Sequence, residues 1–471
     1  MDNQTDKPNR KFKMPHSYVI LFMVILFVSV LTYIIPAGEL ARYADPETGT
    51  TLVDPNSFTY LDSQPVSFIG IFQSIIQGME QSSTIIFFVL IIGASFGMIQ
   101  STGAVEAGIS RLVELLEGKE RIVIPIIAFL FSLAGAMLGT AEELLPFYPI
   151  IISLALALGY DRIIGTSLIL LGAGAGFAGG FLNPFTVGIA QQISGLPLFS
   201  GMTFRLVLYF VILTITILYI MRYAEKVRQD PTKSILYDPN QSDDADYVKH
   251  SEEIEFTTRH KLILLIFSMG MIYIVYGVIR LDFYIQELSA SFLLIGILSG
   301  LVGNLGVNGV ADAFVDGAKE MVYGALIIGV ASTVLVIMES SSILDTVIYN
   351  LSLLLEGYST MLSGIGMFIV QTVLEFFVPS GSAQAAVSMP IMAPLADVLG
   401  LTRQTSVLAF QLGDSLSNVI SPTSGYFMAA LAIGGIKWND WVKWFWPLFL
   451  IWNVLAILFM IAAVLIGYGP F

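Results

Sequence analysis

Two adjacent glutamates, Glu142 and Glu143, occupy the position in this chain that most needs a chemical explanation. They stand in GTAEELLPFYP (139–149), which follows seventeen residues without a charge and precedes a further uncharged stretch. A carboxylate at membrane depth is costly and marks a path for a substrate, an ion or a proton. Two carboxylates side by side also favour a proton on one of them. We therefore expect this pair to bind a positively charged group.

Polar residues at three other places could complete such a site. A second polar turn, PSGSAQ (379–384), has apolar flanks, and two apolar segments are interrupted at GGFLNPFT (179–186) and LGDSLSNVISPTSG (412–425). Unwound backbone and oxygen-bearing side chains at such depth suit Na⁺ and carboxylate groups. The predicted substrate-binding residues are Glu142, Glu143, Thr140, Asn183, Ser380, Ser382, Gln384, Asp414, Asn418 and Thr423. A Na⁺ site is expected among Asn183, Thr186, Asp414, Asn418 and Ser421.

Each of these features also has a plainer interpretation. A single acid could have a hydrogen-bonded structural role, the turns could be ordinary surface loops, and the interruptions could be packing kinks. The binding interpretation is favoured because polar turns and interruptions occur together, and because no lysine or arginine falls within the core of a predicted span. An acidic cavity without a basic side chain suits a substrate cation, Na⁺ or a proton.

Composition argues against several other classes of protein. The chain has no cysteine, and its three histidines lie in polar tails or at a segment edge, so a thiol or histidine metal site is not expected. No P-loop, HExxH or GxSxG motif occurs, which predicts neither an enzyme nor a bound cofactor. The formal charge of −14 is spread over loops, so no nucleic-acid partner is expected. An ion channel is disfavoured because the candidate site is built twice within one chain, not around a symmetry axis.

The elements that must position these residues are membrane helices. The sequence is 55% hydrophobic and only 12% charged, which predicts an all-α polytopic membrane protein in contact with the lipid bilayer. Segments 122–159 and 360–400 are expected to form re-entrant hairpins, since their second arms are short for a full crossing; two full crossings each are the alternative. The predicted continuous spans are 17–36, 82–101, 204–222, 261–279, 286–304, 321–339 and 444–468, and the interrupted ones are 163–199 and 404–437.

The distribution of basic residues predicts the orientation. With the N-terminus in the cytoplasm, the basic residues left outside are only Arg42, Arg205, Arg280 and Arg403. This places a tail (1–16) and a polar linker (223–260) inside. The linker separates a first unit (17–222) from a connecting membrane helix (261–285) and a second unit (286–471).

The two units resemble each other in sequence, which predicts an internal repeat. Several glycine, proline and arginine positions recur at one spacing: Pro149, Gly159, Arg162 and Gly172 align with Pro390, Gly400, Arg403 and Gly413. In the same register Glu143 aligns with Gln384. Because Arg162 is assigned to the inside and Arg403 to the outside, the repeats are expected to be inverted. Inverted repeats with broken helices are typical of secondary transporters, which bind substrate near the midplane.

These motifs also carry a family resemblance. The stretches EELLPFYPIIISLALALGYD, GGFLNPFTVGIAQQISGLPLFSGM and VPSGSAQAAVSMPIMAPLADVLGLTRQTSVLAFQLGDSLSNVISPTSG resemble the YfcC family, which is grouped with ArcD-like arginine/ornithine exchangers and DcuC C4-dicarboxylate carriers. The resemblance implies the ion-transporter superfamily fold, a homodimer, elevator-type movement and a bacterial cytoplasmic (inner) membrane. Superfamily members often bind Na⁺ at the hairpin tips and helix breaks, some with a Ser-Asn-Thr signature. Here the tips read Gly-Thr-Ala-Glu-Glu and Ser-Gly-Ser-Ala-Gln instead.

The residues favour one substrate class over another. A basic amino acid would place its carboxylate at helix N-termini and the hydroxyls of Ser380 and Ser382, and its side-chain cation at Glu142 or Glu143. A Na⁺-coupled C4-dicarboxylate carrier is the alternative, although it leaves the acids without a role. We therefore expect a secondary transporter of arginine or a related cationic amino acid, working by exchange or by Na⁺ or H⁺ coupling.

Overall fold

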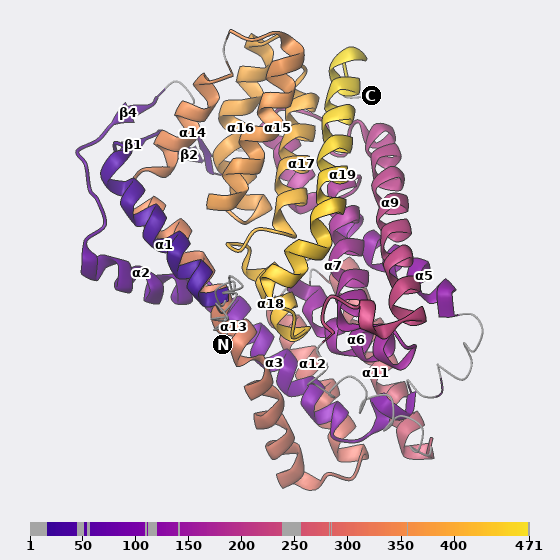
Figure 1. The fold of residues 1–471 in the computed structure, drawn as a ribbon. Helices are drawn as coiled ribbons and strands as arrows, with labels where there is room; N and C mark the ends of the chain where they lie inside the picture. Colours follow the sequence, from indigo (N-terminus) through magenta and orange to yellow (C-terminus); the bar gives the residue numbers. More distant parts are fainter. Residues whose placement is uncertain are drawn as a thin grey trace, which may run out of the picture.

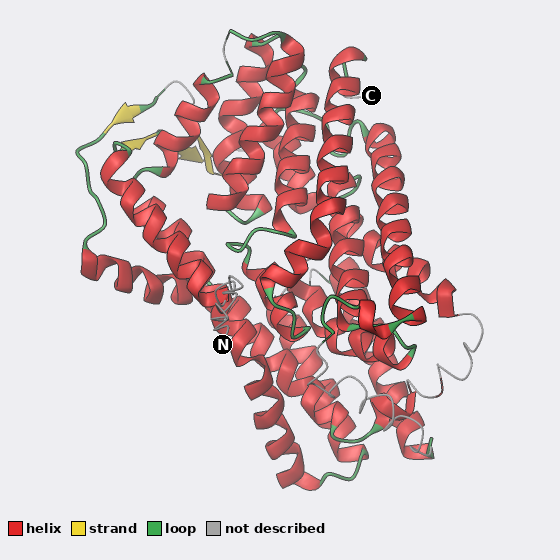
Figure 2. Cartoon of the chain, viewed as in Figure 1, coloured by secondary structure: helices red, strands yellow, loops and turns green. Residues whose placement is uncertain are grey.

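The computed structural model describes residues 17–44, 51–53, 57–108, 111, 120–139, 142–237, 256–281, 283, 285–355 and 357–469. Within these ranges the chain is mostly helical, as Figures 1 and 2 show. Four short strands after the first helix form two antiparallel pairs. Strand β1 (Gly38–Glu39) pairs with β4 (Thr59–Tyr60), and β2 (Arg42–Ala44) pairs with β3 (Thr51–Val53).

The helices of the first half begin at Ser17 and end at Lys233, so helical structure continues past 223, where the sequence predicted the linker to begin. They are α1 (Ser17–Ile34), α2 (Phe68–Gln81), α3 (Ser83–Gln100), α5 (Glu120–Leu133), η1 (Ala134–Leu138), η2 (Glu142–Phe147), α6 (Tyr148–Ala157), α7 (Arg162–Gly179), η3 (Pro184–Gly188), α8 (Ile189–Ile193), α9 (Met202–Gln229) and η4 (Pro231–Lys233). The helices of the second half are α11 (Thr258–Arg280), α12 (Ile285–Val302), α13 (Gly306–Ser340), α14 (Leu344–Leu353), α15 (Thr360–Phe377), α16 (Gly381–Val398), α17 (Arg403–Asn418), α18 (Gly425–Ile433) and α19 (Trp438–Leu465).

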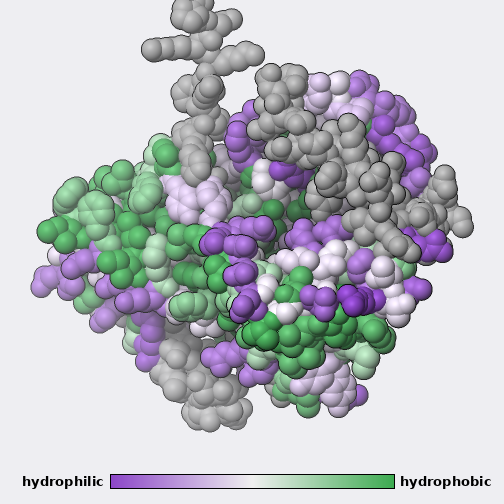
Figure 3. All heavy atoms as spheres, turned by 90° about the horizontal axis from the view of Figure 1, so that it is seen from below, coloured by the Kyte–Doolittle hydropathy of each residue, from purple (hydrophilic) through white to green (hydrophobic). Residues whose placement is uncertain are grey.

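Eight helical segments in the described ranges are long and apolar enough to cross a membrane, so the chain is a multi-pass membrane protein. Large apolar side chains on their outer faces are exposed, such as Leu450, Val454 and Leu458 of α19. Seen from below in Figure 3, apolar residues gather on the flanks at left and lower right, and hydrophilic residues form a band through the middle. This is the arrangement expected when the flanks face lipid.

Two further elements differ from the sequence prediction. Helix α2 falls in no predicted span, because it is only 14 residues long and apolar on one face, with Phe68, Phe72 and Ile76 exposed. Helix α13 begins at Gly306, although the predicted span begins at 321. Its first part includes Asp312, Asp316 and Lys319, which lower the hydropathy of that part although the backbone continues as one helix.

The same helix pairing recurs in both halves of the chain. Helix α5 packs against α7 and helix α15 packs against α17, and α6 and α16 also contact α7 and α17, respectively. Glycines permit this close approach. A Cβ at Gly413 of α17 would lie 2.7 Å from the backbone nitrogen of Thr372 in α15, and Gly176 of α7 lies against the backbone of Ser132 in α5.

The two halves contact each other extensively where α3 of the first half packs on α13 of the second. Gly93 and Gly97 of α3 face Gly317 of α13, so the backbones lie close together. Helix α13 also packs against α2 and α18. As Figure 1 shows, α15 and α16 lie at the top of the molecule and α5 and α6 at the lower right, so the two helix pairs approach the middle from different ends.

Candidate functional site

A cavity of about 400 Å³ lies where the turns of both helix pairs meet both helix interruptions. Its volume is within the range of small-molecule sites. Its walls come from the turn after η1, the turn before α16, the two interruptions, and the helices α3, α7 and α13. The polar residues that line it are Gln81, Ser82, Glu142, Thr186, Ser332, Ser380, Ser382, Ser415, Asn418, Thr423, Ser424 and Tyr426.

The first turn places Glu142 at the cavity wall. Helix α5 ends in a π-helical turn, η1, and Gly139 then takes a left-handed conformation (φ +62°) that a side chain would strain. The chain continues in the 3-10 helix η2, whose first residue is Glu142. Thr140 lies outside the described residues, and so does the side chain of Glu143.

The second turn contributes Ser380 and Ser382 to the wall, but not Gln384. The Gln384 amide nitrogen donates to the backbone oxygen of Gln371 at 2.9 Å and to its Oε1 at 2.8 Å. The Ser388 hydroxyl joins the same network. Gln384 therefore holds α15 and α16 together and does not stand at the substrate position predicted for it.

The first interruption separates α7 from η3. Helix α7 ends at Gly179, Gly180 is left-handed (φ +49°), and Asn183 caps the next turn. The Asn183 Oδ1 accepts the backbone N–H groups of Phe185 (3.0 Å) and Thr186 (3.2 Å). The oxygen that was expected to ligate Na⁺ is therefore engaged in capping. Thr186 does line the cavity, and its buried hydroxyl has no hydrogen-bond partner in the described part of the chain.

The second interruption separates α17 from α18. Asn418 ends α17 and lines the cavity, and its Oδ1 accepts a hydrogen bond from the hydroxyl of Ser424, which caps α18. The hydroxyls of Ser421 and Thr423 lie 2.6 Å apart and share a hydrogen bond. Thr423 faces the cavity, whereas Ser421 does not contribute to its wall. The first interruption thus contributes Thr186 to the cavity wall, and the second contributes Asn418, Thr423 and Ser424.

Asp414 lies behind the second turn and outside the cavity wall. The carboxylates of Asp414 and of Glu375, in α15, are fully buried and interact with each other electrostatically. None of the four oxygens makes a hydrogen bond of ordinary geometry among the described residues, and the Ser421 hydroxyl is a polar neighbour of Glu375. A Cβ at Gly381 would lie 2.9 Å from Asp414 Oδ2 and 2.6 Å from Thr186 Cγ2, so the turn is wedged between the two interruptions. Buried acids without a basic partner suit a small cation or a proton.

Several residues of the wall were missed by the sequence interpretation. Tyr426, next to the second interruption, carries a hydroxyl 2.9 Å from that of buried Tyr148, the first residue of α6. Its place directly after a polar break was the only local signal. Ser82 and Ser332 also line the cavity, and their hydroxyls share a hydrogen bond of 2.6 Å. Nothing in the local sequence distinguishes them from other helix serines, because their place depends on the packing of distant helices.

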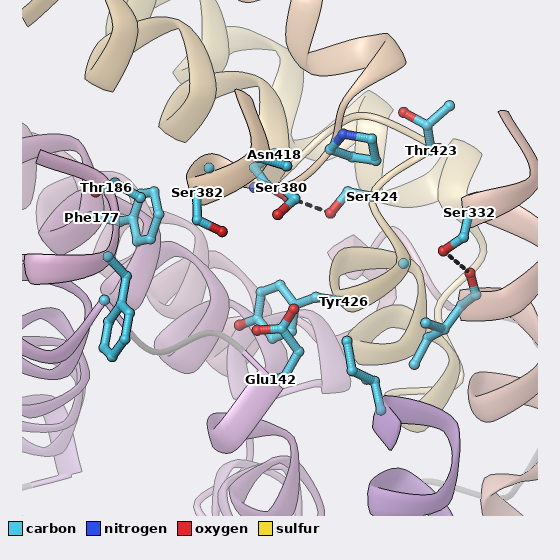
Figure 4. A pocket seen from close by; sticks show the side chains of 18 of the residues that line it. Glu142, Phe177, Thr186, Ser332, Ser380, Ser382, Asn418, Thr423, Ser424 and Tyr426 are labelled. Carbon is cyan, nitrogen blue, oxygen red and sulfur yellow. Dashed lines mark hydrogen bonds between the residues drawn. The ribbon is translucent and has the colours of Figure 1, made fainter. Parts of the chain in front are cut away.

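The charge of the cavity comes from one side chain. Among the described residues that line it, Glu142 is the only charged one, and lysine, arginine and histidine are lacking. Figure 4 shows Glu142 entering from the opposite side to Ser380 and Ser382, with its carboxylate directed toward Tyr426. Elsewhere in the described ranges, no three acidic or histidine side chains come together as a metal site. The cavity therefore offers an acidic end and a hydroxyl-rich end.

Comparison with known proteins gives consistent relatives along the whole chain. The model of the DcuC family, C4-dicarboxylate anaerobic carriers, matches residues 14–465. YfcC of Escherichia coli, named as a proposed basic amino acid antiporter, is 32% identical over 98% of each chain. An uncharacterised protein of Haemophilus influenzae is 30% identical, over 94% of this chain and 95% of its own.

Two solved structures are also similar at 16% identity, each over 97% of this chain. The YdaH transporter of Alcanivorax borkumensis superposes with a TM-score of 0.42 and is covered over 100% of its length. MtrF of Neisseria gonorrhoeae, described as an antimetabolite efflux pump, superposes with a TM-score of 0.43 and is covered over 96%.

Proposed function

The chain belongs to the DcuC family of membrane carriers, and we propose that this member is a secondary active transporter of a basic amino acid of the arginine/ornithine type. The observation that carries the proposal is the charge of the cavity, where Glu142 is the only charged side chain among the described lining residues. A carboxylate in a membrane cavity whose described lining has no basic side chain is stabilised by the positive charge of a substrate. The YfcC relative, named for basic amino acid antiport, supports the same class.

The opposite end of the cavity suits the carboxylate of an amino acid. Ser380 and Ser382 line the wall where the 18-residue helix α16 begins at Gly381. The first amides of a helix are not used within it, and its N-terminus carries partial positive charge. A substrate carboxylate would accept from these amides and from the serine hydroxyls. The two ends together recognise a molecule with an anion at one end and a cation at the other.

Transport would proceed by exchange or by coupling to Na⁺ or H⁺. Asp414 is the strongest candidate for a cation ligand, because its carboxylate is buried without a hydrogen-bond partner among the described residues and approaches Thr186 across Gly381. Asn418, whose Oδ1 accepts from Ser424, and Ser421, bonded to Thr423, lie in the interruption that follows.

The proposed mechanism includes an architecture for moving the site. Units 17–222 and 286–471 would be inverted repeats, with hairpins 122–159 and 360–400 entering the bacterial cytoplasmic membrane from opposite faces. The equivalent pairing of α5 with α7 and of α15 with α17 supports this relation. Residues 1–16 and the linker 223–260 would be cytoplasmic, and 261–285 would supply the inverting crossing. A homodimer with an elevator-like transport domain would complete the mechanism.

A C4-dicarboxylate carrier is the second candidate, favoured by the family description. The serine hydroxyls and the start of α16 could bind one carboxylate of such a substrate. The second carboxylate would then lie in a cavity whose described lining contains Glu142 and no basic group. Like charges repel strongly in such a site, so this substrate requires a bound cation or a proton as a partner.

Binding to the purified protein separates the two candidates. Thermal shift with arginine, ornithine, lysine, succinate and malate, with and without Na⁺, should show stabilisation by the basic amino acids. Glu142→Gln should remove that stabilisation. Glu225→Gln is the matched control, since Glu225 pairs with Arg121 and does not line the cavity. Stabilisation by succinate or malate alone would overturn the proposal and assign the dicarboxylate function.

A further inference from the structure

Tyr426 lies at the acidic end of the cavity and is held there by a second tyrosine. The element that carries it, α18, packs against η2, which carries Glu142. Both side chains line the cavity, and Figure 4 shows the Glu142 carboxylate directed toward Tyr426. The acidic end therefore combines a carboxylate with a phenol.

The hydroxyl of Tyr426 has a fixed partner on the other side. Tyr148 is fully buried, and its oxygen lies 2.9 Å from that of Tyr426. Breaking this contact would leave a buried hydroxyl without a partner, which is costly, so the bond keeps the Tyr426 oxygen in place. A phenol oxygen has two lone pairs and one proton, so the Tyr426 hydroxyl can take part in more than one hydrogen bond at a time.

Guanidinium and ammonium groups would bind to a carboxylate paired with a phenol in different ways. A guanidinium is planar, presents five N–H donors in a rigid fork and stacks on aromatic faces, whereas an ammonium is a compact point charge with three donors. A carboxylate alone can bind either cation. A carboxylate combined with a fixed phenol oxygen and an aromatic ring matches the wider, flat cation better, because it offers acceptors at separated points and a face to stack on.

We propose that Tyr426 is a specificity-determining residue that makes the cavity prefer a guanidinium over an ammonium substrate, and that Tyr148 is the positioning residue that orients its hydroxyl. This inference rests on the proposed transport of basic amino acids. It goes further in naming the cation class and the residue that selects it. The preference follows from the geometry of the Glu142–Tyr426 end and not from the net charge of the cavity.

The test is the ratio of lysine to arginine dissociation constants, measured by competition against labelled arginine on the full-length protein in lipid nanodiscs. Tyr426→Phe removes the hydroxyl and keeps the ring. We expect it to weaken arginine binding about tenfold, as for loss of a hydrogen bond to a charged group, and to change lysine binding less than about threefold. Tyr148→Phe should lower the ratio by a smaller factor. Retained lysine binding in both variants reports that they are folded.

The matched control is Tyr219→Phe, because the Tyr219 hydroxyl bonds the backbone of Trp444 and does not line the cavity. Its ratio should equal that of the wild type. An unchanged ratio in Tyr426→Phe overturns the specificity assignment even if Glu142→Gln still abolishes arginine binding. An unchanged ratio in Tyr148→Phe overturns the positioning role. Failure of the wild type to bind either amino acid is a different result, since it refutes the proposed function itself.

Discussion

A single methyl group added at Gly381 should destabilise the protein and weaken substrate binding. Gly381 is the first residue of α16, and its missing side chain points between the two helix interruptions. A Cβ there would lie 2.6 Å from Thr186 Cγ2 and 2.9 Å from Asp414 Oδ2. Ordinary van der Waals contacts are about 3.5–4.0 Å, so either the turn or both neighbours must move by about 1 Å.

The magnitude follows from two opposing effects. Inserting a methyl group into a packed site costs typically about 1–3 kcal/mol. Replacing glycine by alanine in a helix gains up to about 1 kcal/mol, less at a first position. We therefore expect Gly381→Ala to lower the free energy of unfolding by about 1–2 kcal/mol. Because the turn also carries Ser380 and Ser382, arginine binding should weaken at least severalfold.

The control is Gly309→Ala in α13, where the only atom within 4 Å of an added Cβ is the Cβ of Leu305, at 3.2 Å. It should gain the helix preference without the clash, and it should leave binding unchanged. Chemical unfolding in detergent gives the stability difference, and calorimetry gives the affinity. If Gly381→Ala is as stable as Gly309→Ala and binds arginine normally, the turn is not wedged between Thr186 and Asp414, and the site geometry is wrong.

Three further variants test other parts of the site. Gln384→Ala should lower the free energy of unfolding by about 1–3 kcal/mol, because it removes two buried hydrogen bonds to Gln371. The ratio of lysine to arginine dissociation constants should not change, and a change would return Gln384 to the substrate site. Asp414→Asn should raise the midpoint of thermal unfolding in potassium buffer, because it removes a buried carboxylate without a described hydrogen-bond partner. The same variant should lose any extra stabilisation by sodium, and retained sodium stabilisation would exclude Asp414 as the ligand. Asn183→Ala should cost about 1 kcal/mol of unfolding free energy through loss of the cap on η3, measured by chemical unfolding, and an unchanged stability would mean that the cap contributes nothing.

Much of the helical framework could be predicted from the chain because composition governs it. The predicted span 82–101 corresponds to α3 (Ser83–Gln100), and the predicted span 444–468 lies mostly within α19 (Trp438–Leu465). The interruptions could also be located, since Gly180 adopts a left-handed conformation and Pro184 and Pro422 lack an amide donor. These are local properties of residue type, and they act wherever the residue stands.

The exact extents of two helices were not predictable in the same way. The charged start of α13 has low hydropathy, but hydrogen bonding along the helix does not depend on hydropathy, so the helix extends to Gly306. Helix α2 has its apolar residues on one face, so they do not form a continuous apolar stretch long enough to predict a membrane span.

By itself, the sequence determined that the protein lies in the membrane, where its helices break, and that Glu142 stands between two long uncharged stretches. Only the tertiary structure decided which polar groups share the cavity. It directed Gln384 into the interface between α15 and α16, engaged Asn183 Oδ1 in a cap, and joined Tyr148 to Tyr426 across 278 residues of chain. The physical reason is that membrane depth and helix breaks follow from each residue's own transfer free energy and backbone freedom. The neighbours of a side chain depend instead on how distant helices pack, and no local pattern contains that information.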